Sequence, residues 1–405
     1  MVSVSKMLST ISKKIIKPSS PTPSTQRCHK LSLLDQRPYN YMPLVFFYPK
    51  HQVATIPNGP KQLPNLLANS VSKTLTCYYP WAGSLKDNAT IDCDDSGVEF
   101  FEVQISSQMD KVIHHPNSNI KELTFRQVGD ACSAYYFLRD WAALTRNPNA
   151  KISPYFAEDS LFPSPFDGPL VASVIESKNK DCIQKRFVFS DSKLSALKAY
   201  IADESGLQNP TRSEVVNALL YKCAAFAVSG SSGSFQRSQL IQYSNLRERI
   251  SPPLPPSTIG NILTVFSTPI YNNERDLRLP KLVRDIRKYK NNLSSKNNLE
   301  ENEWVVEMLD AYRTGKELFN QRNCDVYLCS STLMYEYEKL DFGWGRPAKG
   351  SLGNVGQFSK NFILMNTPDR GVEAFVNLNE QEMCLFDKDK DLLEFPTPID
   401  RDNLN

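Results

Sequence analysis

The most distinctive stretch of this chain is Asp341-Phe342-Gly343-Trp344-Gly345. Glycine adopts backbone angles that other residues avoid, so the two glycines predict a tight, irregular path. The phenylalanine and the tryptophan supply large apolar area for a core or an interface. The aspartate can accept hydrogen bonds from backbone N–H groups or pair with an arginine. On these residues alone, a structural turn is favoured over a catalytic loop.

The composition is that of an ordinary globular protein. The chain has 405 residues, of which 40% are hydrophobic and 22% charged, enough for two or three domains. The net charge of +3 gives no footprint for nucleic acid or an anionic membrane. Nine cysteines occur without a CxxC pair, which argues against a disulfide framework or a zinc site. No apolar run is long enough to cross a bilayer, so we expect a cytoplasmic protein with no membrane partner.

Strands and helices are mixed along the chain, without a repeat. Apolar runs predict strands at 45–48, 183–189, 240–244 and 326–331. Helical spacing predicts helices at 61–78, 130–146, 211–226, 282–293 and 304–319. Two hairpins are expected, 89–93 with 98–105 and 362–365 with 372–378.

Local signals mark where some of these elements begin and end. Thr211 with Glu214 predicts a capping box, and Asn379 with Glu382 can begin the last helix. Residues 229–234 are expected to be a flexible Gly/Ser loop. Neither GxGxxG nor GxxxxGK[ST] occurs, so a nucleotide phosphate cradle is not predicted.

The DFGWG stretch resembles the signature of the BAHD family, the plant acyltransferases that use acyl-CoA. Other stretches resemble that family in the same order along nearly the whole chain, with the closest similarity to its alkaloid-type branch. They are KPSSPTP at 17–23, LSLLDQ at 31–36, YPWAG at 79–83, KRFVF at 185–189, TRSEVVNALLYK at 211–222, NLR at 245–247, PPL at 252–254 and GN at 260–261.

The resemblance implies an α/β fold with two similarly sized mixed-sheet domains of the chloramphenicol-acetyltransferase-like type and an active-site channel between them. We place an N-terminal domain at 1–160, a crossover loop at 161–181 and a C-terminal domain carrying DFGWG at 182–405. The resemblance also implies a monomer that transfers an acyl group to a hydroxyl of an alkaloid or another specialised metabolite. Acyl-CoA, here acetyl-CoA, is then the co-substrate, and no bound cofactor or metal is required. The DFGWG stretch itself supports the architecture away from the chemistry.

The family's second signature, HxxxD, carries its catalytic base, and here it is altered. Asp130 fits the aspartate of that motif, which puts Arg126 at the position of the histidine. Arginine stays protonated at physiological pH, so Arg126 is not expected to be a base. It can instead bind an anion or polarise a carbonyl oxygen.

The span before Arg126 is also short. From Gly83 to Asp130 is 47 positions, a few dozen fewer than the resemblance implies. The apolar strand pair that leads to the family's histidine is missing, and 107–122 is mostly polar. Loss of those strands from the first domain should cost packing as well as chemistry. A splicing or gene-model error covering the histidine would leave the same gap.

Two further roles follow from the resemblance. The motif's aspartate, Asp130, is expected to pair with Arg247 of the NLR element, and breaking a buried pair from one side is costly. The family usually has a Ser-Trp pair upstream of DFGWG near the oxyanion. Here the tryptophan is absent, and Ser330 or Ser331 is a possible oxyanion donor.

The other histidines give no obvious replacement for the base. His114 and His115 lie in the polar span before Arg126 and read as a solvated loop pair, while His29 and His51 read as surface or loop residues. Adjacent histidines alone are a poor metal site. The missing base therefore leaves open a second interpretation, a catalytically impaired or repurposed homologue that binds a small molecule or a partner protein.

Overall fold

The computed structural model describes residues 8–36, 43–54, 56, 59–87, 89–105, 109, 129–156, 182–250, 252–295, 324–353 and 359–399. The chain divides into two compact units. Unit 1 comprises Met1–Val174, Leu254–Ile262 and Tyr335–Asn354, and unit 2 comprises Ile175–Pro253, Leu263–Met334 and Val355–Asn405.

Unit 1 contains short strands and two longer helices. The strands are β1 (Leu8–Ile16), β2 (Cys28–Lys30), β3 (Leu44–Phe47), β4 (Ser84–Asp87), β5 (Thr90–Asp92), β6 (Val98–Ile105), β7 (Tyr155–Phe156), β10 (Thr258–Ile259) and β13 (Lys349–Leu352). The helices are α1 (Lys50–Val53), α2 (Leu63–Cys77) and α4 (Ala131–Arg146), with 3-10 turns at Ser24–Gln26, Pro60–Gln62, Tyr79–Ala82 and Tyr337–Lys339.

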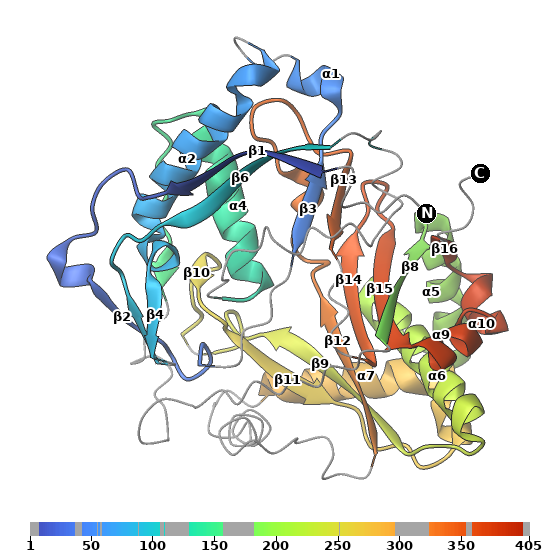
Figure 1. Cartoon of the computed structure of the whole chain (residues 1–405). Helices are drawn as coiled ribbons and strands as arrows, with labels where there is room; N and C mark the ends of the chain where they lie inside the picture. Colours follow the sequence, from blue (N-terminus) through green and yellow to red (C-terminus); the bar gives the residue numbers. More distant parts are fainter. Residues whose placement is uncertain are drawn as a thin grey trace. The chain divides into compact units, whose positions relative to one another are not determined.

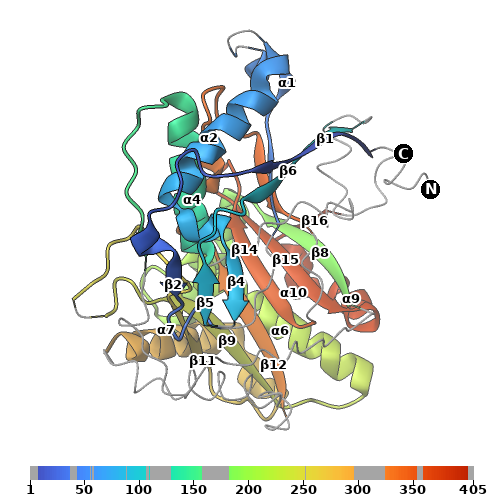
Figure 2. The same cartoon turned by 60° about the vertical axis from the view of Figure 1, so that its left-hand side comes forward.

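The core of unit 1 lies where α2 and α4 pack against each other (Figure 2). Val71, Leu75 and Tyr78 of the α2 segment meet Phe137 of α4 in one buried cluster. Among the described residues, the sheets around this core have two or three strands: β1-β6, β10-β7, β13-β3 and β2-β5-β4. The sheet content of the described part of unit 1 is therefore divided into small pieces.

The hairpin predicted from 89–93 and 98–105 is wrong, although both strands exist. β5 pairs with β2 and β4, and β6 pairs antiparallel with β1. The short connection predicted local pairing, but the partner of β6 comes from the start of the chain. Pairing between segments so distant leaves no turn signal in the sequence.

Unit 2 is built on one large sheet. Its strands are β8 (Cys182–Phe189), β9 (Ser238–Asn245), β11 (Leu263–Ser267), β12 (Asp325–Ser331), β14 (Asn361–Asn366), β15 (Val372–Asn379) and β16 (Thr397–Ile399). Its helices are α5 (Asp191–Ser205), α6 (Arg212–Ser232), α7 (Leu279–Ser295), α9 (Glu380–Phe386) and α10 (Lys390–Glu394), with a 3-10 turn at Glu274–Leu277.

The seven described strands of this sheet run in the order β11-β9-β12-β14-β15-β8-β16 (Figure 1). β12 is parallel to both β9 and β14, and the other neighbours are antiparallel. Alternate side chains of the strands, such as Phe187, Phe362 and Val376, join residues of α5, α6, α7, α9 and α10 in one buried cluster. We call this the helix face of the sheet, and the opposite side its second face.

Several predictions for unit 2 are confirmed. β14 and β15 form the expected antiparallel hairpin. Thr211 and Glu214 make the predicted capping box at the start of α6, and Asn379 and Glu382 make one at α9. These signals lie within a few residues of the structure that they determine, which is why the sequence contains them.

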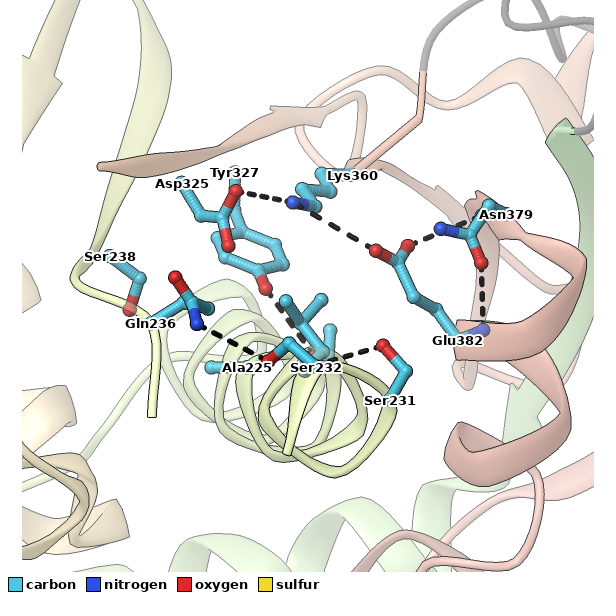
Figure 3. Close-up of polar contacts among 12 residues, drawn as sticks. Ala225, Ser231, Ser232, Gln236, Ser238, Asp325, Tyr327, Lys360, Asn379 and Glu382 are labelled. Atoms are coloured by element: carbon cyan, nitrogen blue, oxygen red, sulfur yellow. Dashed lines mark hydrogen bonds and ion pairs between the residues drawn. The ribbon is translucent and has the colours of Figure 1, made fainter. Parts of the chain in front are cut away.

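The flexible loop predicted at 229–234 is wrong, because α6 continues to Ser232 and ends at Gly233. Serine side chains bond back to the helix: Ser229 Oγ donates to the carbonyl of Ala225 at 2.9 Å, and Ser231 Oγ to that of Val228 at 3.0 Å. Figure 3 shows Ser231 and Ser232 on the last turn, where Gln236 Nε2 donates to Ser232 Oγ at 3.3 Å. The serine hydroxyls therefore bond to helix carbonyls, and the helix ends one residue after them at the left-handed Gly233.

The two units also divide the sequence differently from the predicted domains. Residues 335–354, which include DFGWG, group with unit 1 rather than with the C-terminal part of the chain, and so do 254–262. β13 pairs with β3, and the Tyr337 hydroxyl donates to the carbonyl of Ala131 at 2.7 Å. The chain thus returns twice to its first unit. The predicted crossover loop at 161–181 and the predicted helix at 304–319 lie outside the described residues.

Candidate functional site

Of the two residues predicted to stand in the HxxxD motif, only the second is among the described residues. Arg126 lies outside the described residues, as do His114 and His115, whereas Asp130 is the N-cap of α4. Asp130 is 4% exposed, and its Oδ1 accepts hydrogen bonds from the backbone N–H of Ser133 at 2.9 Å and from Ser133 Oγ at 3.0 Å. The motif's aspartate therefore begins the helix that follows it.

The start of α4 is tied to the GN element at 260–261. Ser133 Oγ donates to the carbonyl of Gly260 at 2.9 Å, and the Gly260 N–H lies 3.0 Å from the same oxygen. The N–H of Asn261 donates to Asp35 Oδ1. The sequence analysis matched the GN and LSLLDQ elements to the family but predicted no role for them. It also did not predict that Ser133 would connect the start of α4 to Gly260. The serine three residues after an N-cap aspartate was the available signal.

Arg247 is the most voluminous of the fully buried side chains in the described part of the chain, with 1% exposure. Within its own unit, Arg247 Nη1 and the Arg247 backbone N–H both donate to Asn245 Oδ1, at 3.1 and 3.0 Å. Asn245 thus orients the turn that carries the guanidinium. The pairing of Arg247 with Asp130 stays a prediction.

Ser330 and Ser331 point to opposite faces of the unit 2 sheet. Side chains alternate along a strand, and Cys329 of β12 belongs to the helix-face cluster. Ser331, two residues on, shares the face of Cys329 and is paired with Leu364, another member of that cluster. Ser330 therefore lies on the second face. The apolar core fills the helix face, so of the two serines only Ser330 is placed to meet a ligand.

The second face is mixed: buried apolar side chains such as Phe375 and Ile363 lie there beside buried charged ones. Arg186 and Glu373 form an ion pair there at 3.3 Å, with side-chain exposures of 2% and 1%. Burial lowers the pKa of Arg186, and the carboxylate of Glu373 opposes that shift. Buried charges are costly unless they are paired, so this face holds a polar arrangement that packing alone does not require.

The DFGWG loop is closed by its own aspartate. Asp341 Oδ1 accepts hydrogen bonds from the N–H groups of Gly343 at 2.7 Å and of Gly345 at 3.0 Å. The two glycines have φ values of +114° and +102°, a region that other residues rarely adopt. Arg146 at the end of α4 donates to the Asp341 carbonyl. The predicted tight turn is confirmed.

Aromatic rings fix this loop within unit 1. Phe342 and Trp344 are each 6% exposed, and their rings stack at 5.7 Å. Trp141 of α4 meets the Phe342 ring edge-on at 5.2 Å. Tyr48 donates to the carbonyl of Leu340 at 2.9 Å, and burial, followed by the charge of Asp341, raises its pKa. The loop therefore contributes to packing and offers no reactive group.

A charged cluster fixes the beginning of β12, the strand that carries Ser330 near its end (Figure 3). Lys360 bonds Asp325 and lies 3.9 Å from the Glu382 carboxylate, with its Nζ 5.8 Å from the ring centre of Tyr327. Burial raises the pKa of Glu382, and the charge of Lys360 opposes that rise. Lys360 thus joins the first residue of β12 to α9 from the position just before β14.

Two histidines, His29 and His51, are among the described residues. His29 of β2 is 8% exposed and meets the ring of Phe156 edge-on at 5.7 Å, which makes it a packed strand residue rather than the surface or loop residue we expected. His51 lies exposed on α1. Within the described residues, no group of three or more His, Cys, Asp or Glu side chains is suited to hold a metal ion. No helix in that part of the chain is long and apolar enough to cross a membrane.

Comparison with known proteins identifies the family. A family model described as the Transferase family matches residues 6–128 and 124–393. The chain is 39% identical to acyltransferase Pun1 of Capsicum frutescens, over 96% of this chain and 98% of that protein. The chain belongs to the BAHD family of plant acyl-CoA-dependent acyltransferases.

Other BAHD relatives agree with this assignment. Minovincinine 19-hydroxy-O-acetyltransferase of Catharanthus roseus is 31% identical over 95% of this chain and 97% of its own length. The crystal structure of vinorine synthase superposes with a TM-score of 0.77 and 27% identity, over 93% of this chain and 96% of that one. The predicted chloramphenicol-acetyltransferase-like α/β fold and the alkaloid-type branch are therefore confirmed.

The comparisons also bear on the short span before Asp130. The alignment with Pun1 extends over 437 positions, more than the 405 residues of this chain, so that relative has residues for which this chain has no counterpart. The family model matches in two segments that meet at 124–128. This is the region where the sequence predicts the missing strand pair.

Proposed function

We propose that this BAHD protein is an acyl-CoA-dependent O-acyltransferase. It transfers an acetyl group from acetyl-CoA to a hydroxyl of an alkaloid or another specialised metabolite, and Arg126 stands where relatives have their catalytic histidine. The free cysteines throughout the chain suit work in the reducing cytoplasm. The proposal includes action as a monomer.

One observation carries the proposal: the family elements that follow the short span are built into ordered structure. Asp341 closes the DFGWG turn by accepting hydrogen bonds from the N–H groups of Gly343 and Gly345. Asp130 caps the start of α4. The large sheet of unit 2 presents Ser330 on its second face, away from the helices. An O-acetyltransferase among the relatives supports acetyl as the acyl group and a hydroxyl as the acceptor.

The proposed chemistry is addition to a thioester. The acceptor hydroxyl attacks the thioester carbonyl, its proton leaves, and the C–S bond breaks to release CoA and the ester. A positioned general base contributes about 10²–10⁴ to such a rate. Arg126 stays protonated and does not supply that base, although its charge can stabilise the oxyanion. We therefore expect slow turnover in which the hydroxyl loses its proton to solvent.

A second candidate function is favoured by a specific observation. Arg126, the residue expected at the position of the family's histidine, is not a base, and the sheets described in unit 1 have only two or three strands each. Both features suit a homologue that binds a small molecule or a partner protein without transferring an acyl group.

Product analysis separates the two functions. Purified protein is incubated with acetyl-CoA and a panel of alkaloid and phenylpropanoid alcohols, and acetylated products are measured by mass spectrometry. An ester that appears only with protein supports the transferase. Saturable binding of an acceptor without any ester favours the binding protein.

A further inference from the structure

A row of side-chain amides crosses the second face of the unit 2 sheet. β14 and β15 pair Asn361 with Asn377, and β15 and β8 pair Asn377 with Gln184. The flanking pairs Phe362–Val376 and Leu378–Ile183 pack in or against the helix-face cluster. The three amides therefore point to the opposite side. Three neighbouring strands thus present the same chemical group at the same level.

The central amide of the row is buried without a partner. Asn377 is 0% exposed, and neither its Nδ2 nor its Oδ1 has a hydrogen-bond partner among the described residues. Gln184 beside it is 5% exposed. A buried polar group that makes no hydrogen bond lowers stability, and a leucine would fill this sheet position without that cost. Asn377 is therefore better explained by a ligand than by packing.

The amide row shares its face with the candidate oxyanion donor. Leu328 of β12 pairs with Asn361, and Ser330 follows two residues later on the same side. Ser330 is thus on the second face, one side-chain level from the amide row and toward the end of β12. A ligand that reaches Ser330 with its reacting carbonyl can extend back over Asn361 and Asn377.

The chemistry of the row fits one part of acyl-CoA. A side-chain amide offers a donor N–H₂ and an acceptor C=O, so it matches the secondary amides of the pantetheine arm, which carry one N–H and one C=O each. The adenosine phosphates need cations, which the row does not offer. Resting on the function proposed above, we propose that Asn377, with Asn361 and Gln184 on either side, binds the pantetheine amides of acyl-CoA.

The test compares two ligands that differ in the arm. Binding of CoA and of adenosine 3′,5′-bisphosphate, which lacks pantetheine, is measured by calorimetry for the wild type and Asn377→Leu. We expect Asn377→Leu to weaken CoA about tenfold, the loss of two net amide hydrogen bonds, and to leave the bisphosphate unchanged. We also expect it to melt no lower than the wild type, because it removes an unpartnered amide. Asn377→Ala, which adds no bulk, replaces it if the leucine does not fold.

Gln242→Leu is the matched control. Gln242 is a buried amide of the same sheet on the helix face. Its Oε1 accepts from Asn217 Nδ2 at 3.0 Å, while its Nε2 has no partner among the described residues, so it differs from Asn377 in its face and in this one hydrogen bond. We expect this variant to lose stability and to keep the wild-type affinity for both ligands. Equal CoA affinity in the wild type and in the Asn377 variants would overturn the assignment of the amide row alone. A wild type that binds neither ligand would overturn the proposed transferase together with it.

Discussion

The carboxylate of Asp341 and the backbone N–H of Gly345 are joined by a hydrogen bond of 3.0 Å, which closes the turn around the intervening aromatic residues. The same oxygen also holds the N–H of Gly343. One side chain thus satisfies two backbone donors in a turn that has no regular secondary structure. The acid at the head of DFGWG is explained by this capping role.

Removing that carboxylate is expected to destabilise the fold. Asp341→Ala removes the acceptor of two backbone N–H groups, which costs about 1 kcal/mol in all because water can reach the exposed Gly343. Asp341→Asn keeps an oxygen acceptor and should lose less than half as much. The free energy of unfolding in urea measures both variants, and an alanine variant as stable as the wild type would refute the capping role.

Asp130 is expected to matter more for folding than for ligand binding. Asp130→Ala removes the N-cap of α4, which costs about 1 kcal/mol, and it also removes the predicted partner of Arg247, which raises the loss further. Asp130→Asn keeps the cap and loses only the charge, so the difference between the two variants isolates the cap. Thermal unfolding gives the stability and calorimetry the CoA affinity. An alanine variant with wild-type melting temperature would exclude both roles.

Glu214 and Arg287 should make stability depend on acid pH. Burial raises the pKa of Glu214, but the hydrogen bonds from Arg287 and from the Thr211 N–H bring it below its ordinary value of 4.5. The contribution is therefore complete above pH 4.5 and is lost as the pH falls through the lower folded-state pKa. We expect Arg287→Met to cost about 2 kcal/mol at pH 7, and the deficit to shrink below pH 4.5.

The control for this pair is Arg287→Lys, which keeps the charge near Glu214. Arg287 Nη2 lies 2.7 Å from Glu214 Oε2, and Arg287 also donates to two backbone carbonyls, so the lysine should recover part of the loss. Urea unfolding at neutral and acid pH measures each variant. A deficit that stays constant over this range would show that Glu214 does not couple the pair to pH.

Ser330 and Ser331 form a matched pair for testing the oxyanion role. Ser330→Ala should lower the rate of acetyl transfer, by about tenfold or more if Ser330 donates to the oxyanion. Ser331→Ala faces the core and should leave the rate near that of the wild type. Product formation with saturating acetyl-CoA gives both rates. Equal effects of the two substitutions would contradict the assignment by face.

Much of this fold could be predicted because its signals are local. The capping boxes at Thr211 and Asn379 and the β14–β15 hairpin each depend on residues a few positions apart. The pairing of β6 with β1 depends on segments distant in sequence, as does the return of 335–354 to unit 1. Neither leaves a periodic or turn signal, so the sequence predicted the strands and missed their partners.

The site residues that lie in recognisable motifs could be predicted from the sequence. Those whose role depends on tertiary packing could not. Asp130 and the DFGWG turn were found from their resemblance to family motifs. The choice between Ser330 and Ser331 required knowing which face of β12 the helices cover. Asn377 looked like one polar residue in an apolar run, and only the register placed it beside Asn361 and Gln184. The pairing of the strands determines which of these side chains share a face of the sheet.

The measurement that tests the central claim most directly is the release of free CoA from acetyl-CoA by the wild type and by Arg126→His. The proposal predicts slow acceptor-dependent release by the wild type, because Arg126 is no base. It predicts an increase of about 10²-fold or more in the histidine variant, since the substitution returns a general base to the position expected for the family's histidine. No acceptor-dependent release from either protein, while both remain folded and bind CoA, would contradict acyl transfer as the function of this chain.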